Sequence, residues 1–185
     1  MGFKDLRYIS VTMVLCGALF TPTAFSNDDQ IENADAIHTQ AGCEALAEKY
    51  GQTAFVHVRN IRSEEGNVRV EIYANNEEEF LKGDMRLNRV DVPSIDYERD
   101  VCLILPGVEK YALVVIHDRN ANDKADFFTE GFGFSNNVQL KLSKPKLDEV
   151  AFQAKPGVNK MDIDLSYMFV SDHDKEEKRR KFRRR

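Results

Sequence analysis

Oxygen-bearing side chains recur at short spacing in residues 117–126. They are Asp118, Asn120, Asn122 and Asp126, at relative positions 1, 3, 5 and 9. Alternating carboxylate and amide oxygens allow a tight loop to surround Ca²⁺, which takes about six to eight oxygen ligands in proteins. The pattern departs from an EF-hand loop, because position 6 is Asp123 rather than glycine and position 12 is Thr129.

The same side chains also suit a purely structural role. Asp and Asn oxygens often accept hydrogen bonds from backbone N–H groups two residues further along, and such Asx-turns organise a loop without any ion. The sequence therefore leaves two interpretations of this segment open, a calcium site and a loop held by its own backbone contacts.

A Gly-Phe-Gly-Phe sequence at residues 131–134 lies in the same predicted loop, which runs over residues 118–137. The alternating glycines permit close approach of the backbone, so both phenylalanine rings can pack onto one end of the domain. The alternative is an exposed aromatic platform that grips a ligand such as a sugar or a peptide, which requires solvent-facing rings. On that interpretation, the ligand-binding residues are His117, Glu130, Phe132, Phe134 and Asn136.

Nucleophilic catalysis has little support in the sequence. His117 ends a predicted strand and could act as an acid–base group, but no serine or cysteine stands at a recognisable spacing from it. Ser135 lacks the Gly-x-Ser-x-Gly context of a nucleophile turn. A hydrolase therefore ranks below two non-enzymatic functions, a binding or accessory domain and a calcium-stabilised structural module.

Composition and charge restrict the class of protein. The chain has 185 residues, of which 42% are hydrophobic, enough for one core but not for two large domains. Residues 1–26 carry a net charge of +1 and residues 172–185 carry +4, which leaves −10 on residues 27–171. An acidic body does not suit a nucleic-acid partner, since phosphate contacts need a positive face. The basic tail either aids solubility or contacts an anionic lipid or polysaccharide surface.

The N-terminal residues have the parts of an export signal. Lys4 and Arg7 precede an apolar stretch at 8–20, and the small residues Ala24 and Ser26 occupy the −3 and −1 positions of a cleavage site. The stretch is shorter than the roughly 20 residues that span a bilayer, which disfavours an uncleaved anchor. We expect cleavage near Ser26, a periplasmic or secreted mature chain without a transmembrane segment, and an unknown ligand or envelope protein as its partner.

Export leaves two cysteines, Cys43 and Cys102, in the mature chain. In an oxidising compartment such a pair normally forms a disulfide. A metal site is the less favoured alternative, because no second cysteine or histidine stands at ligand spacing; His38 is five residues from Cys43.

Hydrophobic periodicity predicts an all-β domain after one short helix at residues 41–50, which ends before Gly51. Residues 54–59 and 68–73 are expected to form a hairpin, and residues 101–105 and 111–116 an antiparallel pair. The predicted strands are residues 54–59, 68–73, 86–92, 101–105, 111–116, 138–142, 150–154 and 161–167. About seven to eight short strands without a long helix predict an antiparallel β-sandwich over 41–171, between a flexible leader at 27–40 and a disordered tail at 172–185.

The order of motifs resembles the bacterial domain of unknown function 2141, a family of uncharacterised exported proteins. The likeness spans about residues 54–167, and its most specific part is the string Glu-Gly-Phe-Gly-Phe-Ser-Asn-Asn at 130–137. Further matching positions are Pro106, Gly107, Tyr111, Ala112, His117, Asp118 and Pro145. The resemblance implies an immunoglobulin-like or prealbumin-like sandwich in an exported protein, with no established activity.

Overall fold

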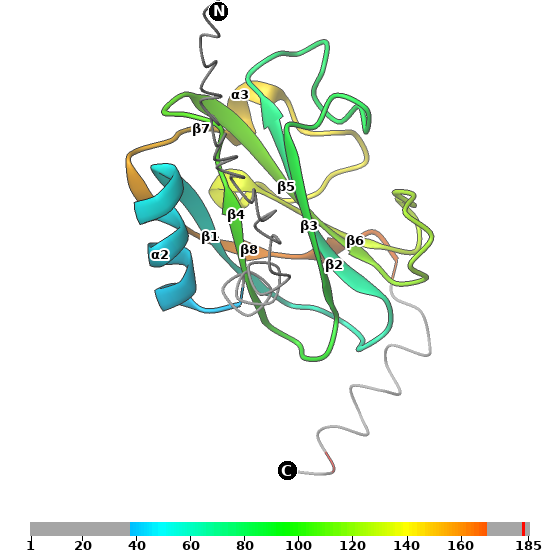
Figure 1. Cartoon of the computed structure of the whole chain (residues 1–185). Helices are drawn as coiled ribbons and strands as arrows, with labels where there is room; N and C mark the ends of the chain where they lie inside the picture. The colour runs from blue at the N-terminus through cyan, green and yellow to red at the C-terminus, as the bar shows by residue number, and fades with distance from the viewer. Residues whose placement is uncertain (1–37, 170–182, 184–185) are drawn as a thin grey trace, which may run out of the picture.

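Two β-sheets face each other in the computed structural model, which describes residues 38–169 and residue 183 (Figure 1). The smaller sheet has the order β4-β1-β8 and the larger sheet the order β3-β2-β5-β6-β9, with β7 also paired to β5. The strands of the smaller sheet are β1 (Gln52–Arg59), β4 (Arg99–Ile104) and β8 (Gly157–Asp164). Those of the larger sheet are β2 (Asn67–Ala74), β3 (Asn88–Pro93), β5 (Lys110–Asp118), β6 (Gly131–Phe134), β7 (Ala151–Gln153) and β9 (Ser166–Tyr167). The predicted all-β sandwich is confirmed.

Helix α2 (Gln40–Tyr50) lies against the outer face of the smaller sheet, beside β1 in Figure 1. The Thr39 hydroxyl caps its first turn by accepting a hydrogen bond from the Gly42 N–H at 3.1 Å. Gly51 ends the helix with a positive φ of 96°, and its N–H donates to the Ala47 carbonyl. The predicted helix is therefore present. Cys43 on this helix forms the expected disulfide with Cys102 on β4, with their Cα atoms 5.5 Å apart.

The main core fills the space between the sheets. Alternate residues of β1, β2 and β5 point into it, since successive side chains of a strand face opposite sides. Strand β5 is buried on both faces, as its apolar sequence predicts, because a second apolar cluster covers the outer face of the larger sheet. That second cluster comprises Tyr73, Phe80, Ala112, Val114, Ile116, Phe132, Phe134, Leu147 and Val150.

Two expected strand pairings are wrong. Strands β1 and β2 do not form a hairpin, because β1 pairs with β4 and β8 whereas β2 pairs with β3 and β5. Strands β4 and β5 likewise lie in different sheets. In both connections the chain crosses the sandwich and buries an apolar side chain, Ile61 in the first and Leu105 in the second. Asn60 makes the first crossing possible by adopting a left-handed φ of 63°.

Three further details differ from the sequence expectation. The β1–β8 pair is parallel, although the other strand pairs among the described residues are antiparallel. Residues 138–142 form no strand, and the side chain of Leu142 is 87% exposed. The Gly-Phe-Gly-Phe segment, expected in a loop, is instead β6. Its glycines are required, because a Cβ atom on Gly133 would lie 2.4 Å from the Ile163 Cγ2.

The expected export signal at 1–26, most of the leader at 27–40 and nearly all of the basic tail at 172–185 lie outside the described residues. Within the described part, no helix has the length and hydropathy needed to cross a membrane.

Candidate functional site

His117 lies near the end of β5 and is fully buried. Its Nε2 lies 2.9 Å from the Glu65 carbonyl oxygen, which can only accept, so Nε2 carries the proton. Its Nδ1 then accepts from the Tyr167 hydroxyl at 2.6 Å. Burial lowers the pKa of His117 to about 4, so the imidazole is neutral at physiological pH. His117 therefore connects β5 to the segment around Glu65 and, through Tyr167, to β9.

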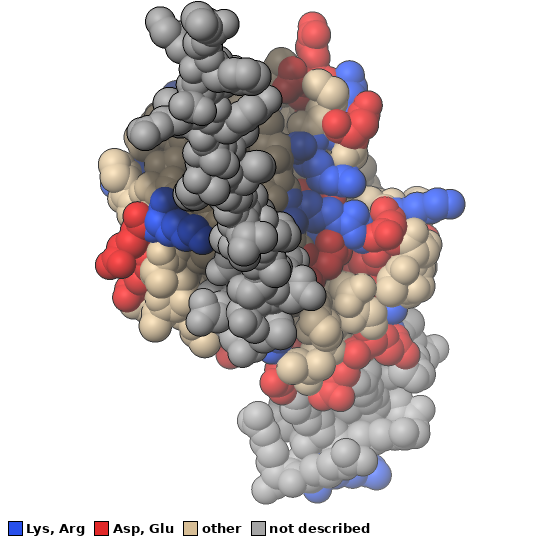
Figure 2. All heavy atoms as spheres, in the orientation of Figure 1, with Lys and Arg blue, Asp and Glu red and all other residues tan. Residues whose placement is uncertain are grey.

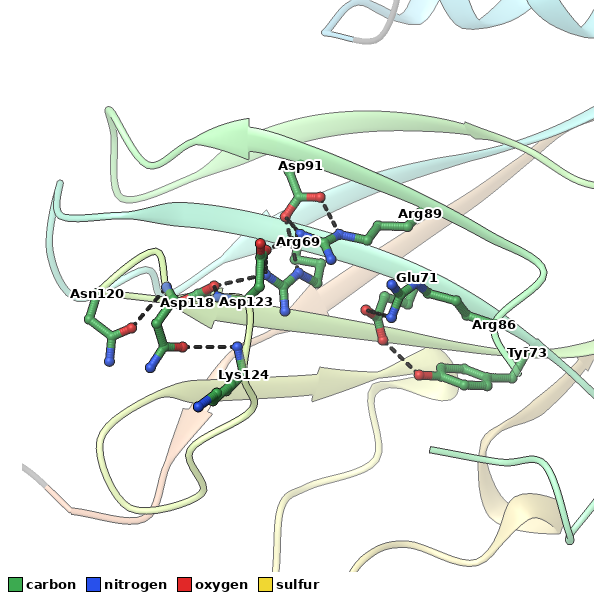
Figure 3. A network of polar contacts seen from close by, with 11 residues as sticks. Arg69, Glu71, Tyr73, Arg86, Arg89, Asp91, Asp118, Asn120, Asp123 and Lys124 are labelled. Atoms are coloured by element: carbon green, nitrogen blue, oxygen red, sulfur yellow. Dashed lines mark hydrogen bonds and ion pairs between the residues drawn. The ribbon is translucent and has the colours of Figure 1, made fainter. Parts of the chain in front are cut away.

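Asp118 follows His117 and points to the opposite face of the larger sheet, where it meets Arg69 of β2. The Arg69 Nη2 lies 2.8 Å from the Asp118 Oδ2, and both side chains are buried. Arg69 also donates from Nε to Asp91 at 3.0 Å and from Nη2 to Asp123 at 2.7 Å. Figure 3 shows the guanidinium of Arg69 surrounded by these carboxylates. Arg69 therefore joins strands β2, β3 and β5 to the loop that follows β5.

The loop at 119–130 is organised by the oxygens that could bind calcium. The two Asp118 oxygens accept from the backbone N–H groups of Asn122 and Asp123 at 3.2 and 3.0 Å. Asn120 and Asn122 each accept from the N–H two residues further along, at 3.0 and 2.9 Å, and Figure 3 labels Asn120 and Lys124 at these two contacts. Asp126 likewise accepts from the Phe128 N–H at 2.9 Å. The Asx-turn interpretation thus describes contacts that are present. No group of three or more His, Cys, Asp or Glu side chains in the described part of the chain is arranged to hold a metal, and the calcium site stays a prediction.

Glu130 lies beneath this loop and is fully buried. Its Oε2 accepts from the Asp126 N–H at 2.8 Å, whereas its Oε1 is buried without a hydrogen-bond partner among the described residues. Burial raises the pKa of Glu130 to about 7, and the nearby carboxylates of Asp118 and Asp126 act in the same direction. A carboxyl group with this pKa is partly protonated at neutral pH.

Phe132 and Phe134 are buried, with 8% and 3% of their surface exposed. They pack in the outer apolar cluster, which is the arrangement expected if the rings pack onto the domain. Asn136 donates to the carbonyls of Glu149 and Ala151, both at 3.0 Å, and so fastens the segment that leads into β7. The predicted ligand-binding residues do not form one surface. His117 faces the space between the two sheets, whereas Glu130 faces the outer side of the larger sheet.

A cavity of about 380 Å³ lies on the outer face of the larger sheet. The segments at 75–87, 119–129 and 138–146 enclose it, and its volume is within the range of small-molecule sites. Its charged and polar lining comprises Arg69, Glu71, Tyr73, Arg86, Asp123 and Lys144. Its apolar lining comprises Leu81, Val114, Ile116, Ala125, Phe127, Phe132, Phe134 and Leu140. Of the predicted ligand-binding residues, Phe132 and Phe134 line this cavity.

Sequence reasoning missed the polar side of this cavity. Arg69, Glu71 and Tyr73 alternate with core residues along β2, a pattern that normally indicates a solvent-facing side of a strand. All three are instead buried under loops.

On the face shown in Figure 2, basic and acidic side chains lie side by side over the region of β3.

The polar groups of the cavity contact one another. The Tyr73 hydroxyl donates to the Glu71 Oε2 at 2.7 Å, and the Arg86 Nη1 lies 3.5 Å from the Glu71 Oε1 (Figure 3). Burial and the adjacent Glu71 carboxylate raise the pKa of Tyr73, so its hydroxyl remains a hydrogen-bond donor at neutral pH. The described lining contains no histidine, cysteine, serine or threonine.

A family model described as an uncharacterized protein conserved in bacteria (DUF2141) matches residues 56–162, a range that includes β2, β5, β6 and the loop at 119–130. No curated protein and no solved structure matches the chain.

Proposed function

This chain belongs to the bacterial family of uncharacterized proteins DUF2141, and we propose that it is an exported, non-enzymatic binding domain whose ligand occupies the cavity over the larger sheet. The observation that carries the proposal is the composition of that cavity. One side is apolar, and the other presents arginine, glutamate and tyrosine side chains. Such a combination is typical of sites that bind a small molecule and fix its orientation with a few polar groups.

Two observations support an export-dependent role. The Cys43–Cys102 disulfide joins α2 to β4, and disulfides of this kind persist in oxidising compartments. The sequence of residues 1–26 has the pattern of a cleavable signal. Fractionation of cells that produce the full chain, with mass spectrometry of the product, tests this part of the proposal. A cytoplasmic product that retains residues 1–26 would contradict it.

A binding role fits the lining better than catalysis does. The described lining has no histidine, cysteine, serine or threonine, and its two acids, Glu71 and Asp123, are held in ion pairs with arginines. Tyr73 and Glu71 hydrogen-bond each other, and neither contacts a histidine or a second acid that would form a catalytic pair.

The binding proposal is tested with the uncharged fluorescent probe N-phenylnaphthylamine and the purified disulfide-bonded protein. We expect saturable binding, because the probe is small and apolar. Leu140→Trp fills the cavity and should weaken binding at least about fivefold, whereas Leu142→Trp, on an exposed residue of the same segment, should not. No saturable binding, or equal binding by both variants, would overturn the proposal.

A second candidate function is a calcium-stabilised structural module of the cell envelope. The unpartnered Oε1 of Glu130, buried beside Asp118 and Asp126, supports it, because a cation would satisfy this oxygen. Asn120 and Asn122 supply further oxygens in the same loop. The test is a calcium titration with thermal unfolding as the readout. A melting temperature unchanged at millimolar calcium would exclude this candidate.

The basic residues at 175–185 favour an anionic surface as a partner under either function. Each basic residue close to an anionic surface contributes about 1 kcal/mol of attraction at low salt. We propose that this tail holds the domain near an anionic envelope surface. Its deletion should reduce retention on anionic vesicles, and unchanged retention would remove the tail from the proposal.

A further inference from the structure

We propose that the ligand of the cavity is an amphipathic anion, with a carboxylate-like or sulfonate-like group beside Arg69, Arg86 and Lys144 and an apolar body against the phenylalanine side. This inference rests on the proposed function, since it names the chemical class that the same cavity takes.

Hydrogen-bond donors are in surplus on the polar side of the cavity. Arg69 has five N–H groups and uses three, on Nε and Nη2, for Asp91, Asp118 and Asp123. Its Nη1 donates to no residue that the structure describes, and Figure 3 shows one guanidinium nitrogen without a dashed line. The Arg69 guanidinium lines the cavity, so a bound acceptor oxygen can take a hydrogen bond from it.

The acids of the lining are already engaged. Glu71 accepts from Tyr73 and lies beside Arg86, and Asp123 accepts from both Arg69 and Arg89. Both acids of the lining are therefore paired with arginines, Glu71 with Arg86 and the Asp123 Oδ1 with Arg69 and Arg89, while Lys144 has no such partner in the described part of the chain. A ligand that supplies acceptor oxygens completes this set, whereas a cationic ligand would compete with the arginines for the same carboxylates.

Lys144 adds an uncompensated charge at the rim of the cavity. Its side chain belongs to an exposed residue, and it forms no ion pair with any residue in the described part of the chain. Arg86 is also partly exposed, and its Nη1 lies 3.5 Å from the Glu71 Oε1. The two cations place a positive potential at the opening, which attracts an anion and orients it.

The apolar side restricts the rest of the ligand. Phe127 and Phe132 lie with their ring centroids 6.2 Å apart, and Phe134 and Leu140 extend the same side. Aromatic and aliphatic side chains of this kind bind flat or chain-like apolar groups through burial of surface. A small inorganic anion would leave this surface in contact with water, so the cavity fits an amphipathic anion better.

The test compares two probes of similar aromatic structure, the anionic anilinonaphthalene sulfonate and the uncharged N-phenylnaphthylamine. Lys144→Glu should weaken binding of the anionic probe about tenfold and change binding of the uncharged probe less than about twofold. Lys141→Glu, on an exposed residue of the same segment that does not line the cavity, is the matched control and should change neither. Glu71→Gln removes a negative charge but keeps an acceptor for Tyr73, and should tighten binding of the anionic probe about threefold.

The outcomes separate the two proposals. If Leu140→Trp blocks both probes while Lys144→Glu and Lys141→Glu affect the anionic probe equally, the cavity binds ligands but the anionic class is wrong. The anionic class is also wrong if Glu71→Gln leaves the affinity for the anionic probe unchanged or weakens it. If Leu140→Trp blocks neither probe, the proposed function itself fails. Selective loss of the anionic probe with Lys144→Glu supports both proposals.

Discussion

Arg69 and Asp118 form an ion pair at 2.8 Å in which both side chains are buried. Asp118 also accepts the N–H groups of Asn122 and Asp123, so one carboxylate connects the sheet to the start of the loop at 119–130. The same guanidinium lines the proposed ligand cavity. The pair therefore couples the stability of the domain to the shape of its candidate site.

Removal of the Arg69 charge should destabilise the protein strongly. Arg69→Met leaves Asp118 buried without a counter-charge, and we expect a loss of about 3 to 5 kcal/mol in the free energy of unfolding. Arg89→Met is the control, because Arg89 pairs with the more exposed Asp91 and Asp123 and should cost about 1 kcal/mol or less. Urea denaturation measures both values. Equal losses for the two variants would show that the Arg69 pair has no special role.

Glu130 should make the protein less stable as pH rises. Its pKa is raised from 4.5 to about 7 in the folded state, so the folded protein binds an additional proton between these values. The contribution of Glu130 to stability is therefore full below pH 4.5 and is lost as pH rises towards about 7. Glu130→Gln should be more stable than the wild type at pH of about 8, on the order of 2 kcal/mol, and similar to it at pH of about 4. A variant that is less stable at both pH values would contradict the assignment.

His117 should make the protein less stable as pH falls, which is the opposite of the effect of Glu130. Its pKa falls from 6.5 to about 4 on folding, so the unfolded chain binds the additional proton. Stability from the neutral imidazole is full above pH 6.5 and is lost as pH falls to about 4. His117→Gln should unfold with a weaker dependence on acid, by on the order of 2 kcal/mol across this window. Parallel pH profiles for the variant and the wild type would exclude this role.

The disulfide should account for a large share of the stability. Cys43 and Cys102 are 59 residues apart, and closing a loop of this length restricts the unfolded chain by about 4 kcal/mol in the chain-entropy model. Cys43→Ala combined with Cys102→Ala should lose an amount of that order in thermal or urea unfolding. Reduction of the wild type should produce a similar loss, and a reducing agent should not affect the double variant. A double variant as stable as the oxidised wild type would show that the cross-link is dispensable.

Local patterns predicted the elements but not how they pair. The apolar run of β5 required burial on both faces, and the alternation in β1 and β2 required one buried face, so these strands could be found from sequence alone. Their partners depend on Ile61 and Leu105, which enter the core where the chain crosses between sheets. A short polar connection has the same sequence appearance in a hairpin and in such a crossing. Strand β6 was missed because its glycines, which fit the tight contact with Ile163, usually indicate a loop.

The candidate site was predictable only in part. The Asx contacts of Asn120 and Asn122 follow from local spacing, and the sequence presented them as one of two interpretations. The cavity depends on segments far apart in the chain, which bring Leu81 and Leu140 over the same face of the sheet. Periodicity along β2 cannot reveal that distant loops cover Arg69 and Glu71.

The parallel β1–β8 pair delays completion of the smaller sheet during synthesis of the chain. Strand β1 begins at Gln52, but its partner β8 begins at Gly157, so the smaller sheet cannot close until almost the whole domain has been synthesised. Pairing at this sequence distance is slow relative to local contacts. If the chain is exported, as we propose, it can therefore reach a secretion channel before the β1–β8 pair has formed.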